Sequence, residues 1–380
     1  MILGVAQEQH AERCRLFAQW KQLDWHILHD PINVLESAAV PIILALDEHG
    51  IVRLSGPNPQ TFKADFLDQT FRDDAGNSTN MLSPEVPAPF DQLKAAAERE
   101  NSATAWRQWA DAVALWGGDS QLSNAVEGYR AAVRSNPSDA AAWFRLGVCL
   151  RLRYEVNPEA HDDFRQAVDA WCAAVDLDPN QYIWRRRIQQ YGPRLAKPYP
   201  FYDRVPEAEA EIRARGETPV PLVVRPQGAE IAQPAGSFAV QSRAVQNPDP
   251  QKKINRDSGS VLCDVVVVPA TVKPGGSARV HLRFRLAPLT TDHWNNESEP
   301  LRVWIDPSDG VVSSDQLIEA TLPPTAVSRE ARVIEWEIQV DDDARGTIAV
   351  PVYALYHLCD ESQGQCRLLR QDIRVEMKVE

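Results

Sequence analysis

The sequence is poor in cysteine and in positive charge, and it has no long apolar run. Its 380 residues include only six cysteines, which is too few for a disulfide scaffold, and none of them lies in a Cys-x-x-Cys motif. Acidic residues outnumber Lys and Arg by 53 to 40. This balance argues against binding nucleic acid or an anionic membrane, because phosphate groups require clustered basic side chains. No segment approaches the ~18 consecutive apolar residues of a membrane helix.

Several catalytic motifs are also missing. There is no glycine-rich phosphate loop, no G-x-S-x-G and no H-E-x-x-H, which disfavours nucleotide-binding proteins and hydrolases. We therefore expect no cofactor and no metal site. The first residues lack the basic region and small-residue cleavage site of a signal peptide. The expected compartment is the cytoplasm, where a cycling disulfide is easier to reconcile than a lasting one.

The chain does contain enough apolar material for real cores. Hydrophobic residues make up 44% of it, with 11 tryptophans, and the length suggests two or three domains. The pattern changes twice along the chain. It predicts an α/β module at 1–72, helical repeats with an aromatic strap at 102–205 and a β-domain at 257–380, joined by linkers at 73–101 and 206–256.

Residues 1–72 have the order strand, helix, three strands, helix. "MILGV", "WHILHD", "VPIILALDEHG" and "IVRLSG" read as strands, the last two joined by an "EHG" turn. "QHAERCRLFAQWKQ" has apolar residues at helical spacing, and "TFKADFLDQTF" closes the segment as a helix. This order predicts one end of an α/β sandwich with a central sheet.

At "GVAQEQ" and "HDPINVLESAAVPIILALDEHGIVRLSG" the segment resembles the later portion of a thioredoxin-like redoxin. The resemblance implies that Pro41 is a cis-proline facing a pair of active-site cysteines. The strand and cysteine-bearing helix that would precede "MILGV" are absent from the sequence as given. Either the natural product starts further upstream or this partial module is catalytically empty. Cys14 lies on the expected helix and is interpreted as a core residue.

A repeat occupies residues 102–192. Aligning Pro137 with Pro179 superposes two sets of small and aromatic residues: Ala125, Tyr129 and Ala132 over Ala167, Trp171 and Ala174. These spacings are similar to those of tetratricopeptide repeats, in which small residues lie where two helices cross. The resemblance implies protein partners, or packing against neighbouring domains. "QYIWRRRIQQYG" is expected to cap the stack. The following strap is expected to lay Tyr199, Phe201 and Tyr202 on a domain surface.

From about Ser258 the pattern has period two. Seven expected strands, separated by turns such as "KPGG" and "DDDARG", predict an antiparallel β-sandwich of immunoglobulin-like type. In "DHWNNESEP", His293 and Trp294 are interpreted as bracing a polar loop against the edge of the sandwich. The last two strands flank "CDESQGQC", so a hairpin would place Cys359 opposite Cys366. Opposed residues have Cα atoms ~4.5 or ~5.5 Å apart, which is within disulfide range.

"VHLRFRLAP", "TTDHWNNESEPLRVWI" and "YALYHLCDESQGQC" resemble the N-terminal domain of the DsbD family of thiol–disulfide interchange proteins. The resemblance implies that Cys359 and Cys366 are a redox pair. Six residues separate the two cysteines here, one more than is usual in the family. Arg367 favours a thiolate at Cys366, whereas Asp360 and Glu361 raise the pKa of Cys359.

His357, two residues before Cys359, is a candidate proton partner. The residues alone leave a cycling pair, a structural staple, free thiols and metal binding open, although the spacing is not typical of zinc.

Two functions remain. The first is a thiol–disulfide oxidoreductase that lacks the redoxin Cys-x-x-Cys, relays electrons through Cys359 and Cys366, and has a thioredoxin-type partner. The second is a non-catalytic scaffold that binds proteins through its repeats and β-sandwich.

Overall fold

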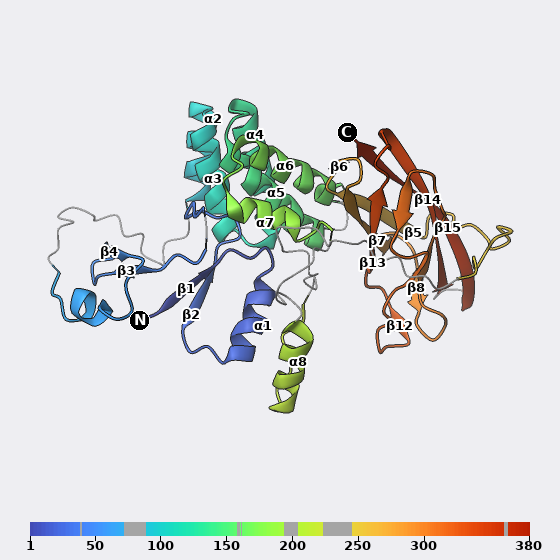
Figure 1. Ribbon diagram of the computed structural model, residues 1–380, viewed down its shortest axis with the longest axis horizontal. Coiled ribbons are helices and arrows are strands. Elements are labelled where there is room, and N and C mark those ends of the chain that lie inside the picture. The colour runs from blue at the N-terminus through green and yellow to red at the C-terminus, as the bar shows by residue number, and fades with distance from the viewer. Residues whose placement is uncertain are drawn as a thin grey trace.

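The computed structural model describes residues 1–38, 40–71, 89–157, 160, 162–193, 204–222, 245–360 and 364–380. Figure 1 shows a small N-terminal region of strands and one helix, a central stack of helices, and a C-terminal region of β-sheets. The expected multidomain arrangement of α/β, α-helical and antiparallel β regions is confirmed at this level. None of the described helices is both long and apolar enough to cross a membrane.

The N-terminal region has the expected order of elements. Its members are β1 (Leu3–Ala6), α1 (Ala11–Lys21), β2 (His26–His29), β3 (Leu44–Leu46), β4 (Val52–Ser55) and a five-residue π-helix (Lys63–Leu67). The expectation of one central sheet is wrong. Within the described ranges β1 pairs in parallel with β2, while β3 pairs only with β4 as a separate antiparallel hairpin. In Figure 1 the two small sheets lie apart.

The segment that separates these two sheets is fastened to the helices. Asp30 accepts hydrogen bonds from the backbone of Val34 and Leu35, which fixes a turn. Ile32 is fully buried within the core of the helical region. The chain therefore leaves β2 towards the helices before it returns to β3, so the two strand pairs do not continue one another.

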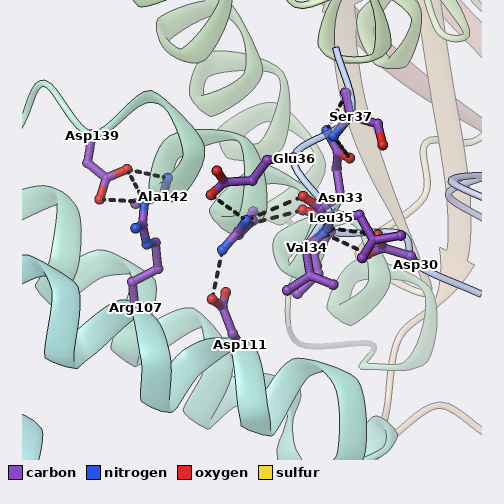
Figure 2. A network of polar contacts seen from close by, with 12 residues as sticks. Asp30, Asn33, Val34, Leu35, Glu36, Ser37, Arg107, Asp111, Asp139 and Ala142 are labelled. Atoms are coloured by element: carbon purple, nitrogen blue, oxygen red, sulfur yellow. Dashed lines mark hydrogen bonds and ion pairs between the residues drawn. The ribbon is translucent and has the colours of Figure 1, made fainter. Parts of the chain in front are cut away.

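Arg145 holds this segment in place. Figure 2 shows the surrounding network of polar contacts, with Asn33 and Glu36 of the segment on one side and Asp111 of the helices on the other. Its guanidinium donates to the backbone carbonyls of Ile32 (3.2 Å) and Asn33 (3.3 Å) and forms an ion pair with Asp111 at 2.7 Å. Burial raises the pKa of Asp111, although Arg145 and Tyr129 favour its charged form. One arginine thus neutralises a partly buried carboxylate and attaches the N-terminal region.

The helical region is a stack of consecutive helices, each packed on the next. They are α2 (Phe90–Glu100), α3 (Ala103–Trp116), α4 (Leu122–Ser135), α5 (Ala140–Val156), α6 (Asp163–Leu177) and α7 (Tyr182–Gln189). α2 corrects the sequence interpretation, which assigned 73–101 to a linker; residues 72–88 lie outside the described part. Gly147 of α5 allows close approach to α6, because a Cβ there would be 2.5 Å from the Trp171 ring.

A further helix, α8 (Arg204–Ala214), overlaps the second expected linker, 206–256. Its apolar face covers α1: Val205, Ala208 and Ile212 form a buried cluster with Leu16 and Trp20. The indole of Trp20 also donates to Glu211 of α8, at 2.7 Å. An amphipathic helix with an available apolar partner therefore forms where composition indicated a linker. The strap residues Tyr199, Phe201 and Tyr202 lie outside the described residues.

The C-terminal region has two sheets. The first has the strand order β10-β13-β7-β5, from Val311–Ser313, Arg332–Val340, Ser277–Leu286 and Val261–Val268. The second is β11-β9-β14-β15-β6, from Leu317–Glu319, Arg302–Ile305, Gly346–Asp360, Gln365–Val379 and Thr271–Val272. β8 (Asp292–Asn295) also pairs with β14, and β12 (Val327–Ser328) pairs with β8. The sequence predicted seven of these strands. The pair formed by β15 and β6 is parallel, so the region is not antiparallel throughout as expected.

Polar contacts join the helices to the first sheet. The Nε2 atom of His281, on β7, is 2.6 Å from the carbonyl oxygen of Tyr191, and its Nδ1 atom is 2.8 Å from Glu335 of β13. Arg283 donates to the carbonyl oxygen of Tyr154 at 2.7 Å. Val266 of β5 belongs to the apolar core of the helical region. The two regions are therefore packed together.

Replacing Arg145 by methionine tests its attachment of the segment after β2 to the helices. The change leaves Asp111 without its cation, so the free energy of unfolding should fall by about 3–5 kcal/mol in urea denaturation. Arg165→Met, on the exposed face of α6, is the control and should change it by no more than about 0.5 kcal/mol. Equal effects of the two substitutions would contradict the structural role given to Arg145.

Candidate functional site

The candidate site lies at the tip of the hairpin formed by β14 and β15. These strands pair continuously from Gly346↔Val379 to Asp360↔Gln365. Cys359 is directly opposite Cys366, and the two form a disulfide with their Cα atoms 4.0 Å apart. The expected placement of the two cysteines is therefore confirmed.

The two sulfur-bearing residues differ in exposure. Cys359 is buried, with 7% of its surface exposed, whereas Cys366 is exposed. The difference follows from the strands on either side. Cys359 lies in β14, which has a neighbour on both edges at this point, and Cys366 lies at the start of β15. An incoming thiolate would consequently reach the sulfur of Cys366 first.

His357 lies on the same face of β14 as Cys359. The alternate residues Tyr356 and Leu358 point into the main core of the sandwich. Residues 353, 355, 357 and 359 therefore share the opposite face, where Tyr353 and Leu355 form a smaller cluster with Trp304. The Nδ1 atom of His357 is buried and makes no hydrogen bond among the described residues. The structure thus places His357 beside the cysteine, as the sequence predicted.

A second histidine lies beside the same cysteine. β8 pairs with β14 so that His293 is directly opposite Cys359, on the edge away from Cys366. Trp294 is buried and its indole donates to the carbonyl oxygen of Glu330 at 2.8 Å, which anchors β8. The bracing role expected for this segment is confirmed for Trp294. His293 was not predicted to belong to the site. The signal was present in the sequence, because neighbouring strand residues point to opposite faces and a core-facing Trp294 directs His293 to the face of Cys359.

Arg367 does not have the role predicted from its position. It is opposite Leu358, a core-facing residue, and it forms an ion pair with the buried carboxylate of Asp292. Its charge is therefore already balanced, which removes the argument that Arg367 favours a thiolate at Cys366. Glu361 lies outside the described residues.

Asp292 anchors the end of β8. Burial alone would raise its pKa, but hydrogen bonds from Ser260, Thr290 and Arg367 outweigh burial and lower it. Thr290 donates to the carboxylate at 2.8 Å. The ionised carboxylate therefore stabilises the strand that positions His293.

The N-terminal region has a separate feature. The Val40–Pro41 peptide bond is cis, as expected for Pro41. Val40 lines a cavity of about 390 Å³ together with Cys14, Phe17 and Arg186. Burial raises the pKa of Cys14 to about 11, and no second described cysteine lines this cavity. The described residues near Pro41 thus contain no cysteine pair.

The remaining cysteines are free thiols with low reactivity. Burial raises the pKa of Cys172 to about 11 and also raises the pKa values of Cys149 and Cys263. Such thiols carry very little thiolate near neutral pH. Any thiol chemistry measured at neutral pH should therefore report on Cys359 and Cys366.

Comparison with known proteins gives no assignment. No family model matches the chain, and neither does any curated protein. Among solved structures it has weak similarity to AvmM, which catalyses macrocyclization in alchivemycin A biosynthesis (TM-score 0.17, 10% identity, 32% of this chain and 94% of that chain). Its similarity to Spo0M, a sporulation control protein from Bacillus subtilis, is equally weak (TM-score 0.18, 12% identity, 32% of this chain and 50% of that chain). TM-scores this low establish no shared fold.

Replacing Asp292 by asparagine should make the free energy of unfolding of the sandwich less dependent on pH in the acid range. A lowered folded-state pKa contributes stability that is present above the unfolded value of about 3.9 and is lost as pH falls through the folded value. At pH 7 the variant should lose about 1–3 kcal/mol of unfolding free energy. The difference from the native protein should shrink below about pH 4.

Asp309→Asn, in an exposed turn, is the matched control for this measurement. Urea denaturation of all three proteins at pH 7 and pH 3 would decide the matter. A constant difference between Asp292→Asn and the native chain at both pH values would contradict the assigned pKa direction.

Proposed function

We propose that this protein is a thiol–disulfide exchange protein of the thioredoxin-like superfamily and that Cys359 and Cys366 are its redox pair. One observation supports the proposal above others. A disulfide at the tip of a hairpin joins an exposed cysteine to a buried one, and the buried cysteine has a histidine on its own strand and another on the neighbouring strand. A purely structural disulfide needs neither the exposure nor the histidines.

The exchange would proceed in two steps. A thiolate of a dithiol partner attacks the sulfur of Cys366, the bond between the two cysteines breaks, and the electron pair passes to the sulfur of Cys359. The second thiol of the partner then attacks the partner's own sulfur in the mixed disulfide and releases Cys366. The partner dithiol is oxidised to a disulfide, and two electrons and two protons reach Cys359 and Cys366. A thioredoxin-type protein is the proposed partner.

Features of all three regions support the family resemblances on which the proposal draws. The seven-strand core of the C-terminal region supports an immunoglobulin-like sandwich akin to the DsbD N-terminal domain. The buried repeat residues support tetratricopeptide-type helices: Ala125, Tyr129 and Ala132, with Ala167, Trp171 and Ala174, are all fully buried. The order of β1, α1, β2, β3, β4 and the closing helix supports a partial redoxin module in the N-terminal region.

A non-catalytic scaffold is the second candidate. It is favoured by the length of the β14–β15 ladder and by the burial of Cys359, which are also compatible with a staple. Closing the eight-residue loop would stabilise the fold by roughly 2.5 kcal/mol on the chain-entropy estimate. On this alternative, replacing both cysteines lowers stability and leaves partner binding intact.

The single-cysteine variants separate these functions. Cys359→Ser leaves the exposed Cys366, which should form a mixed disulfide with oxidised glutathione at pH 7.5. Cys366→Ser leaves the buried Cys359, which should react at least about tenfold more slowly, since access limits the exchange. Mass spectrometry of tryptic peptides identifies the modified residue, and the double variant supplies the background rate. If both single variants react only at the background rate, the exchange function is contradicted and the structural disulfide of the scaffold remains.

A further inference from the structure

We propose that His293 is the proton donor and acceptor for Cys359 during disulfide exchange. The inference rests on the proposed function and names a group within that site which the sequence resemblance does not supply. Its basis is the position of β8, which brings an imidazole opposite the sulfur that must leave and return.

The strand register gives the geometry. β8 pairs with β14 at three positions, and the central one joins His293 to Cys359. Side chains directly opposite each other in an antiparallel pair have Cβ atoms about 4.5–5.5 Å apart. His357 lies two residues along the same strand, so its Cα is about 6.6 Å from that of Cys359. Of the two imidazoles, the register therefore places His293 nearer.

The orientation of His293 is fixed by its neighbour. Trp294 points into the sandwich core, where its ring meets Tyr356 edge-on at 5.7 Å. Because successive strand residues alternate, His293 must point to the face that carries Cys359. Asp292, on the other side, faces the core and is held by Thr290 and Arg367. Both flanking residues thus restrain the imidazole.

Cys359 requires such a group because it is buried. When a partner attacks Cys366, the electron pair from the broken bond arrives at the sulfur of Cys359, a residue with only 7% of its surface exposed. Burial disfavours a thiolate, as the raised pKa values of Cys14 and Cys172 show in this chain. A protonated imidazole stabilises the departing thiolate and gives it a proton. In the reverse direction the neutral imidazole removes that proton, so Cys359 can attack the mixed disulfide at Cys366.

Among the described residues around His293, the imidazoles are the groups best placed to exchange a proton with Cys359. Asp360 is opposite Asp292 and accepts a hydrogen bond from the hydroxyl of Thr291 at 3.2 Å, and Arg329 donates to the backbone at Thr290 and Asp292. Along the other part of the β14 edge, Arg302 is opposite Leu355 and forms an ion pair with Glu299. Within the described ranges, His293 and His357 are the titratable side chains that flank Cys359 on its own face.

The test compares His293→Gln with His357→Gln in the full chain. Reduction of the disulfide by dithiothreitol is followed by thiol trapping between pH 5.5 and 8.5, and each rate is divided by the concentration of attacking thiolate. For the native protein this corrected rate should fall as pH rises through the range in which histidine loses its proton. His293→Gln should be about tenfold slower at pH 6 and should lose this pH dependence.

His293→Asn is measured in parallel, so that one poorly folding variant does not decide the result. The thermal midpoint of each variant is recorded, because a purely structural role would change stability and not the pH profile. An unchanged pH profile in both His293 variants, or its loss only in His357→Gln, would overturn the proposal. A native disulfide that dithiothreitol cannot reduce at any pH would instead overturn the proposed function.

Discussion

The pairing of β14 with β15 is the constraint on which the rest of the C-terminal region depends. Fifteen consecutive positions are in register, and the ladder runs through the centre of the larger sheet. One face of β14 fills the sandwich core. The edge of β14 that does not pair with β15 pairs first with β9 and then with β8. A shift of this register by one residue would move every side chain of the strand to the opposite face of the sheet. The same register therefore fixes the core, the cysteine pair and the histidine opposite Cys359.

Buried polar contacts fix the positions of the regions of the chain relative to one another. Arg145 attaches the segment after β2 to the helices, and His281 and Arg283 attach the first sheet of the sandwich to the ends of α5 and α7. Each of these side chains bonds to backbone carbonyls. Such contacts depend on backbone position, so they hold the regions in a defined arrangement and cannot be replaced by apolar burial alone.

Period-two and helical patterns were sufficient to predict most elements. The seven main strands, the repeat helices and the opposition of Cys359 and Cys366 follow from local spacing, which is retained when the chain folds. Contacts distant in sequence were not predictable in the same way. The separation of β2 from β3 depends on Arg145, more than 100 residues away, and α8 forms against α1. His293 joins the site through β8, a strand of four residues that composition indicated as a loop.

The central claim is that the bond between Cys359 and Cys366 opens and closes at potentials that a cell maintains. Equilibrating the full chain with glutathione buffers of graded potential, followed by maleimide labelling and peptide mass spectrometry, measures this directly. We expect the two cysteines to change together from disulfide to dithiol within that range, while the other four cysteines stay reduced. A pair that remains entirely disulfide, or entirely thiol, across all the buffers would contradict the claim.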